Sequence, residues 1–396
     1  MRFYIGMKKT GHSLRAITLL LALYLLTTLA AAAEKPGKYL FYVGTYTEEG
    51  SKSKGIYAYR YDAATAQITA LGLAAETTNP SFVAPHPNGK YLYAVNEVGN
   101  YKSPNSGGVS AFSIDHATGK LTFLNEVASR GADPCYIIVD KTGKYVLVAN
   151  YTGGSVAVFP VLADGKLGEA SAFVQHTGHG TDPKRQEAAH AHSIDLSPDQ
   201  RFAMVDDLGL DELLVYKFDS AKGSLTPNNP PFAQLAPGVG PRHFALRPDG
   251  KFAYVVAEMG HSVTVFSNDA ANGKLQVVQT VPTLPMDFKG RNDDAEIQMH
   301  PSGKFLYASN RGEDTIAVYA IDGAKGTLTH VGNVPTGGKE PRSFEIDPTG
   351  ALLFAQNQKS DNIVIFRIDQ KTGNLTTTGQ VLEVASPVCV KFLAAE

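Results

Sequence analysis

Side chains suited to proton transfer and anion binding stand beside short apolar segments of this sequence. His192, Arg242 and Arg342 lie at the start of such segments, whereas Glu258 and Arg311 follow the end of one. Histidine exchanges protons near neutral pH, carboxylates act as bases, and the planar arginine fork pairs with anions. These residue types favour acid–base chemistry on a small anionic or carbonyl-bearing molecule.

The apolar segments belong to a pattern that repeats along nearly the whole chain. Each copy reads as two short strands around a turn such as Pro-Asn-Gly-Lys, where Asn favours turn geometry and Gly accepts positive φ. A third strand, a second turn and a fourth strand opening with leucine follow. Corresponding turns recur about every 52 residues, the size of a propeller blade. Copies begin at Pro80, Pro134, Ala191, Pro241, Asp294 and Pro341.

The two ends of the chain supply incomplete copies. The segment 38–45 reads as a second strand without a first, and the segment 387–392 reads as a first strand without a second. If they pair, every blade is complete and the ring has no open ends. We therefore predict an all-β fold, a seven-bladed β-propeller of four-stranded blades over residues 34–396, closed by the C-terminal strand joining the N-terminal blade. An open β-solenoid is the alternative.

The first 33 residues have the features of a signal peptide. Lys8, Lys9 and Arg15 precede an uncharged apolar run, and Ala30–Ala33 offers a small-residue cleavage site. An uncleaved anchor is the alternative, and no later apolar run is long enough to span a bilayer. The expected location is periplasmic or secreted, without stable membrane association after cleavage.

The composition and motifs of the chain argue against several classes of partner and reaction. The chain has 36 Lys and Arg against 38 Asp and Glu, so no basic excess points to nucleic acid. Neither a P-loop nor a G-x-S-x-G nucleophile motif is present. Cys135 and Cys389 fall in repeats that are not adjacent, which predicts small buried thiols rather than a disulfide. The oligomeric state is not predicted.

In a propeller, the loops that enter the innermost strands and leave the second strands open on one face around the axis. Polar residues in these two registers are therefore expected to converge. Arg242 and Glu258 fall at the two ends of one inner hairpin and are expected to be neighbours. The alternative is that such charges pair with one another and hold loops between blades. The predicted substrate-binding set is Asn96, Glu97, Tyr151, Asp207, His243, Glu296, Arg342 and Asn357.

A metal site is an alternative at His176, His179, His190 and His192, because histidines two apart on a strand share a face. They lack a firm carboxylate or cysteine partner, and His176 and His179 fall in what is expected to be a long flexible loop. We predict no metal and no cofactor.

Three stretches resemble one known family, the seven-bladed propeller lactonases. They are residues 240–254 with Glu258, residues 295–311, and residues 185–192, and the resemblance extends over about residues 39–392. The family includes propeller-type 6-phosphogluconolactonases and the fungal 3-carboxy-cis,cis-muconate lactonising enzyme. The resemblance implies a metal-independent reaction on lactones or their open acids.

The resemblance also implies roles for particular residues. By motif position, the His, Glu and two Arg that line the site of the muconate-cyclising relatives are His192, Glu258, Arg242 and Arg311 here. The arginines would hold the anionic group and polarise the carbonyl, while Glu258 or His192 would activate water.

The first expectation is a carboxylic-ester hydrolase of the 6-phosphogluconolactonase type that opens a sugar lactone by water attack at the ring carbonyl. An export signal does not suit a phosphorylated cytoplasmic metabolite, so an unphosphorylated lactone is an open possibility. The alternatives are a muconate-type lactonising lyase and a propeller that binds a ligand without catalysis.

Overall fold

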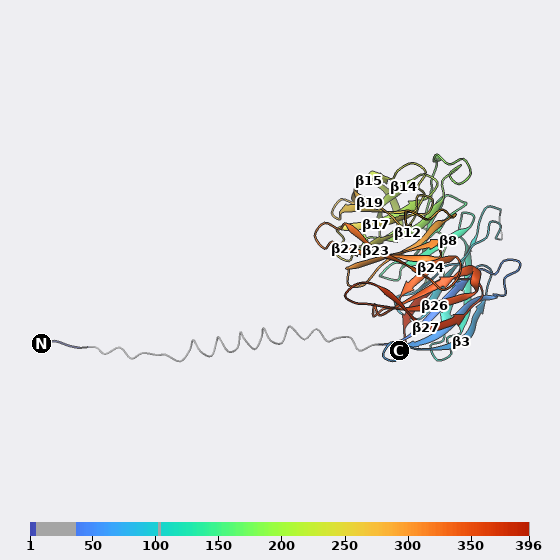
Figure 1. Cartoon of the computed structure of the whole chain (residues 1–396), viewed down its shortest axis with the longest axis horizontal. Helices are drawn as coiled ribbons and strands as arrows, with labels where there is room; N and C mark the ends of the chain where they lie inside the picture. Colours follow the sequence, from blue (N-terminus) through green and yellow to red (C-terminus); the bar gives the residue numbers. More distant parts are fainter. Residues whose placement is uncertain (5–36, 102–103, 396) are drawn as a thin grey trace.

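The computed structural model describes residues 1–4, 37–101 and 104–395. Within these ranges the chain forms seven sheets, each of four antiparallel strands (Figure 1). The only helix of the described part is one 3-10 turn, Gln358–Ser360. The predicted all-β, seven-bladed propeller is confirmed.

Each blade runs from the axis outward through four strands. The innermost strands are β4 (Val83–Pro85), β8 (Pro134–Val139), β12 (Ala191–Leu196), β16 (Pro241–Leu246), β20 (Asp293–Met299), β24 (Pro341–Ile346) and β28 (Pro387–Ala394). The second strands are β1 (Lys38–Thr45), β5 (Tyr91–Asn96), β9 (Tyr145–Asn150), β13 (Phe202–Asp207), β17 (Phe252–Ala257), β21 (Phe305–Arg311) and β25 (Leu352–Asn357). The third strands are β2 (Gly55–Asp62), β6 (Gly108–Ile114), β10 (Ser155–Pro160), β14 (Glu212–Asp219), β18 (Ser262–Asp269), β22 (Thr315–Ile321) and β26 (Asn362–Ile368). The outermost strands are β3 (Gln67–Glu76), β7 (Leu121–Ala128), β11 (Ala172–Gln175), β15 (Ser224–Gln234), β19 (Lys274–Pro282), β23 (Leu328–Pro335) and β27 (Leu375–Glu383).

The ring closes as the sequence predicts. Strand β28 pairs antiparallel with β1, from Tyr39 opposite Ala394 to Thr45 opposite Pro387. We call this sheet blade 1, and blades 2 to 7 follow in chain order. Strand β28 also contacts β24 of blade 7 and β4 of blade 2, and blue and red strands of the ring lie side by side near the C-terminus in Figure 1. Both termini of the ring therefore belong to one sheet.

Neighbouring blades interlock through apolar cores and through their inner turns. Gly143 has φ of +72°, and a Cβ there would lie 2.3 Å from the ring of His86 in the preceding blade. His86 Nε2 lies 2.9 Å from the Gly143 carbonyl, and His300 repeats the contact with Gly350 at 2.8 Å. Glycine is required at such a turn because both the backbone conformation and the neighbour's approach exclude a side chain.

Separate predictions concern the N-terminal signal peptide and the two cysteines. The predicted signal peptide, residues 1–33, falls outside the described residues except for residues 1–4. No helix in the described ranges is long and apolar enough to cross a membrane. Cys135 and Cys389 are buried free thiols, as predicted.

Candidate active site

A β-bulge at the start of five innermost strands, β8, β12, β16, β24 and β28, leaves one residue of each strand out of the ladder and aims it at the axis. In β12 the pairing passes from Ala191 to Ser193, so His192 is left out of the ladder. The same one-residue skip leaves out Arg242 in β16 and Arg342 in β24. Bulges re-aim side chains and are common beside active sites. The bulged residues that line one deep axial cavity are Cys135, His192, Arg242, Arg342 and Val388.

A second group of axial residues lies just past the end of the second strands. Glu97 follows β5, Tyr151 follows β9 and Glu258 follows β17, while Arg311 is the last residue of β21. Successive side chains in a strand point to opposite faces. These residues therefore face the axis, and the asparagines one position earlier face into the blade.

Two adjoining cavities lie at this mouth of the axis. The outer one has a volume of about 300 Å³ and is lined by Tyr151, Arg185, Glu258 and Arg311, among others. The deeper one measures only about 10 Å³, about the space that one water molecule needs. Glu97, Cys135, His192 and Arg342 line both cavities. A small molecule in the outer cavity would therefore sit directly against a water-sized recess.

Glu258 anchors three arginines. Its Oε2 atom lies 2.9 Å from both Arg242 Nε and Arg311 Nη2, and Oε1 accepts a hydrogen bond from Arg185. Although burial alone would raise the pKa of this carboxyl, the three guanidinium groups lower it to about 2. The predicted proximity of Arg242 and Glu258 is present, but Glu258 is a very weak base.

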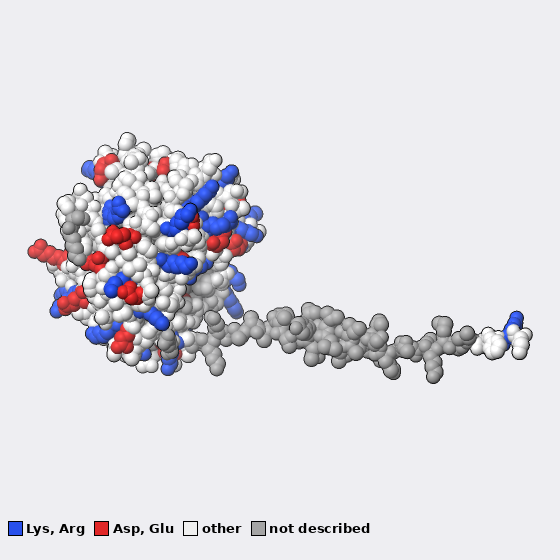
Figure 2. Space-filling model, turned by 180° about the vertical axis from the view of Figure 1, so that it is seen from behind, with Lys and Arg blue, Asp and Glu red and all other residues white. Residues whose placement is uncertain are grey.

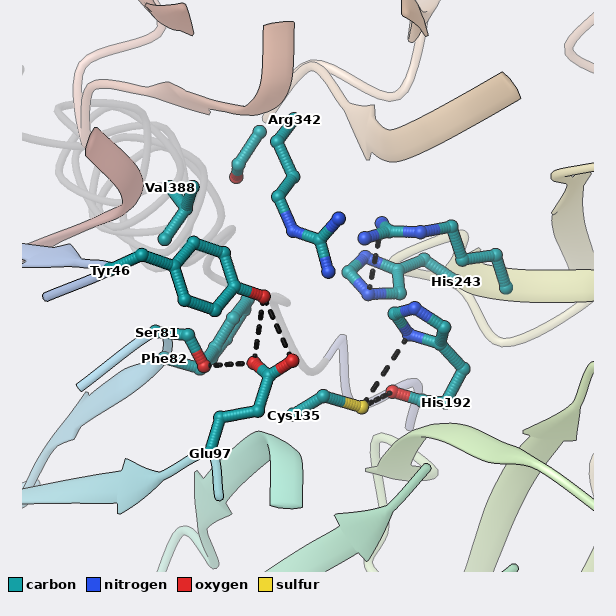
Figure 3. A pocket seen from close by; sticks show the side chains of 11 residues that line it. Tyr46, Ser81, Phe82, Glu97, Cys135, His192, His243, Arg342 and Val388 are labelled. Atoms are coloured by element: carbon teal, nitrogen blue, oxygen red, sulfur yellow. Dashed lines mark hydrogen bonds between the residues drawn. The ribbon is translucent and has the colours of Figure 1, made fainter. Parts of the chain in front are cut away.

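Arg342 differs from the other axial arginines because its guanidinium has no hydrogen-bonding partner in the described part of the chain. Among the described residues its side chain forms no hydrogen bond or salt bridge, and it lies over the ring of Tyr46 at 5.3 Å. Figure 3 shows it pointing into the deep cavity, between Tyr46 and the two histidines. A planar fork of donors is therefore available to an oxygen atom of a ligand.

Glu97 faces Arg342 across the deep cavity (Figure 3). Its carboxylate accepts hydrogen bonds from Tyr46 Oη at 2.8 Å and from Ser81 Oγ. Burial raises the pKa of Glu97 above its ordinary value, although Arg342 and these two hydrogen bonds oppose the shift. Glu97 is thus a stronger base than Glu258 at this mouth.

The two predicted histidines are buried and neutral. His192 Nδ1 lies 3.8 Å from Cys135 Sγ, and its ring lies 5.1 Å from that of His243. Burial and the charge of Arg242 hold the pKa of His192 well below its usual range. Burial likewise lowers the pKa of His243 to about 4. Both imidazoles can hydrogen-bond a neutral ligand without adding charge.

Comparison of the sequence with known protein families identifies the family to which the chain belongs. The sequence model of the family "Lactonase, 7-bladed beta-propeller" matches residues 40–392. The chain belongs to this lactonase family.

Solved and curated relatives support the same class. The lactonase is 39% identical to the 6-phosphogluconolactonase of Bacillus subtilis over 356 residues, covering 90% of this chain and 99% of that protein. It is 35% identical to the 6-phosphogluconolactonase of Formosa agariphila over 309 residues, covering 76% and 85%. The structure of the Pseudomonas aeruginosa periplasmic gluconolactonase matches with a TM-score of 0.83 at 34% identity, covering 91% and 100%. The expectation of a hydrolase of the 6-phosphogluconolactonase type is confirmed.

Four predicted substrate-binding residues of the lactonase line neither cavity at this mouth. Asn96 donates to Thr78 O, Asp207 accepts from His176 Nδ1 at 2.7 Å, and Asn357 donates to Asn362 Oδ1 at 3.0 Å. Glu296 lies beneath His243, with 3.3 Å between Oε1 and Nδ1, and faces the opposite end of the axis. The structure thus does not bring these four side chains to the mouth, since adjacent residues at a strand end point to opposite sides and Glu296 faces the other end of the axis.

Tyr46 and Arg185 line the lactonase site without having been predicted. Tyr46 follows β1 and occupies in blade 1 the position that Glu97 holds in blade 2, so the repeat register was the available signal. Arg185 comes from the segment between β11 and β12 and reaches Glu258 in blade 5. No register signal predicts a contact from so long a connection.

His176 lies at the start of the long connection between β11 and β12, where the sequence places it. Its side chain is buried, with Nδ1 on Asp207 and Nε2 3.1 Å from Tyr216 Oη. The ring of His190 stacks on the ring of Tyr151, with 4.6 Å between the two ring centroids. The four histidines considered for a zinc site thus have separate partners, and no group of three or more ligating residues is gathered within the described ranges.

Proposed function

We propose that this lactonase opens a sugar lactone at the mouth of the axis that holds Glu97 and Arg342. One observation carries the proposal. An unpartnered guanidinium and a carboxylate of raised pKa face a water-sized recess beneath a cavity of about 300 Å³. Attack of water on an ester carbonyl needs a base for the water and a donor for the developing oxyanion.

The steps balance with these two residues. A water in the recess gives a proton to Glu97 while its oxygen bonds to the lactone carbonyl carbon, and Arg342 stabilises the resulting oxyanion. The bond to the ring oxygen then breaks, and that oxygen takes the proton from Glu97. The hydroxy acid product loses its carboxyl proton to solvent at neutral pH.

Glu258 has a positioning role in this scheme. A carboxylate with a pKa of about 2 is poorly suited to accept a proton from water near pH 7. It instead fixes Arg242 and Arg311, which form part of the cavity wall and keep the site electropositive. His192, being neutral, is proposed to hydrogen-bond the substrate beside the recess.

We favour an unphosphorylated lactone. The guanidinium groups toward the outer cavity already face carboxylates: Arg185 lies on Glu258, and Arg291 Nη2 lies 3.4 Å from Asp293. This leaves Arg342 for the carbonyl, whereas the other arginines that line the outer cavity each contact a carboxylate among the described residues. A muconate-type reaction is disfavoured for the same reason, because its substrate carries several carboxylates.

We also propose that residues 1–33 are an export signal, which places the mature protein in the periplasm or outside the cell. An uncharged lactone formed there is a consistent substrate. Immunoblots of periplasmic and cytoplasmic fractions should detect a shortened product outside the cytoplasm. A full-length cytoplasmic product would contradict this.

The catalytic proposal is tested by following acid release in a pH-stat, with spontaneous hydrolysis subtracted. The expected result is fast opening of δ-gluconolactone and slower opening of 6-phosphogluconolactone. Arg342→Ala should lower kcat/KM by about 10²–10³-fold, the effect of losing one oxyanion donor. Absence of turnover of either lactone would favour the muconate-type lyase or a propeller that only binds.

A further inference from the structure

A second pocket lies between blades 4 and 5, away from the axis. Its volume is about 400 Å³, within the range typical of small-ligand sites. The lining comprises three basic and three amide side chains, with Phe202 and Ala271. The basic residues are Arg201, Lys217 and Lys274, and the amides are Asn228, Asn229 and Asn272.

This pocket is distinct from the lactone site. Phe202 begins β13 and Asp207 ends it at the side of the axial mouth, which separates the two ends by about 17 Å at 3.3 Å per residue. The pocket is formed at the turns of the opposite side, between β12 and β13 and between β18 and β19. A ligand can therefore occupy it without touching the axial residues.

The pocket exists because β15 leaves its ladder at this point. Pairing with β14 passes from Pro227 directly to Phe232, so residues 228–231 bulge outward. In β19 and β23 only Val278 and Val331 are skipped at the equivalent place. The wider bulge opens space beside the turn of the next blade.

The floor of the pocket is held in place. Buried Asn228 donates from Nδ2 to the carbonyl of Asn272 at 2.8 Å and to that of Gly273 at 3.1 Å. Arg201 lies over the Phe202 ring at 5.5 Å and donates from Nε to Asp199 at 2.6 Å. A ligand would meet an ordered surface rather than one that must form on binding.

Among the joints between successive blades 2 to 7, only this one has a cation at both lysine positions. Lys217 stands opposite Phe202 in the ladder, and its counterparts in blades 2, 3, 5, 6 and 7 are Ser113, Pro160, Ser267, Ala320 and Arg367. Lys274 follows the second turn of its blade. Its counterparts in blades 2, 3, 4, 6 and 7 are Lys120, Lys166, Ser224, Thr327 and Asn374. Packing of a joint therefore does not require both lysines together.

Both ammonium groups are available to a ligand. Lys217 and Lys274 are exposed and form no salt bridge or hydrogen bond with any described residue, and no carboxylate lines the pocket. Lysine binds phosphate, sulfate and carboxylate groups as a point charge, while exposed amides bind hydroxyl groups. The combination suits an anionic sugar.

We propose that the pocket between blades 4 and 5 is a second ligand site, which binds a monosaccharide carrying a phosphate, sulfate or carboxylate group. Isothermal titration of the purified protein with glucose 6-phosphate, glucose 6-sulfate, glucuronate and glucose tests it. At least one charged sugar should bind with an affinity that falls as NaCl is raised, and glucose should not bind. Comparison of the three charged sugars also identifies which anionic group the site prefers.

Variants locate the binding. Lys217→Ser with Lys274→Ser should weaken it about tenfold or more without changing lactone hydrolysis. Lys144→Ser with Lys304→Ser removes the same charge from exposed positions in other joints and should leave binding unchanged. Three results would overturn the proposal: binding that survives the Lys217→Ser and Lys274→Ser variant, binding that falls equally in the Lys144→Ser and Lys304→Ser variant, or binding that is lost in Arg342→Ala. Absence of binding by every charged sugar at about 10 mM would also overturn it, because that concentration detects even the weak binding typical of exposed ion pairs.

Discussion

The two ends of the propeller axis are lined by the same innermost strands but differ in how their charges are paired. At the opposite end, Lys391 Nζ lies 2.8 Å from Glu345 Oε2, and Tyr136 Oη donates to Asp195 at 2.9 Å. That cavity measures about 340 Å³. At the lactone end, Arg342 has no polar partner among the described residues. Cavity size therefore does not distinguish the ends, whereas an unsatisfied donor does.

The difference lies in the partners that the axial side chains meet. Past the bulge, side chains of neighbouring blades pair, as Lys391 of blade 1 does with Glu345 of blade 7. At the bulge, the extra residue is turned toward the mouth, where Arg242 is paired with Glu258 and Arg342 forms no hydrogen bond with any described residue. Cationic and anionic side chains mix over the face of the molecule that Figure 2 shows.

The largest expected effect at the lactone end is that of Glu97→Gln. Loss of the general base should lower kcat by about 10²–10⁴-fold. Since the pKa of Glu97 is raised, the wild-type rate should fall as pH drops through a value above the ordinary 4.5 of a glutamate. A pH profile of kcat/KM measures this. Persistence of the same acid limb in Glu97→Gln would assign the base to another residue.

Glu258→Gln should act on stability as much as on rate. The carboxylate has a folded pKa of about 2 against 4.5 unfolded, so its contribution of about 3 kcal/mol is present above pH 4.5 and lost as pH falls toward 2. The gap in unfolding free energy between wild type and variant should narrow over that range in denaturant titrations. The rate should also fall because the arginines lose their anchor, yet the acid limb should remain. A pH-independent gap would contradict this role.

The smallest effect on rate is expected at the opposite end. Lys391→Met leaves Glu345 without its cation and should destabilise the fold by about 1–3 kcal/mol, less than a fully buried pair would. Lactone hydrolysis should stay within about threefold of wild type. Adding Glu345→Gln should recover most of the stability, measured by thermal unfolding. A large loss of rate in the folded double variant would mean that the two ends are coupled.

The fold followed from the sequence because each blade is locally encoded. Turns such as the one at Gly143 recur at a constant interval, and the unmatched segments 38–45 and 387–392 predicted the closing sheet. The site followed only in part. Glu258 and Arg242 were placed together correctly, but Asn96 was grouped with Glu97 although only the latter faces the axis.

Sequence alone thus determined the ring, its closure and the two registers from which polar residues approach the axis, since these depend on local turn chemistry and periodicity. Only the tertiary structure decided which of them remain unpaired. Arg185 contacts Glu258 from a distant connection, whereas no carboxylate of the described residues forms a salt bridge with Arg342. Pairing of charges depends on distances between blades, and no local pattern in the chain records those distances.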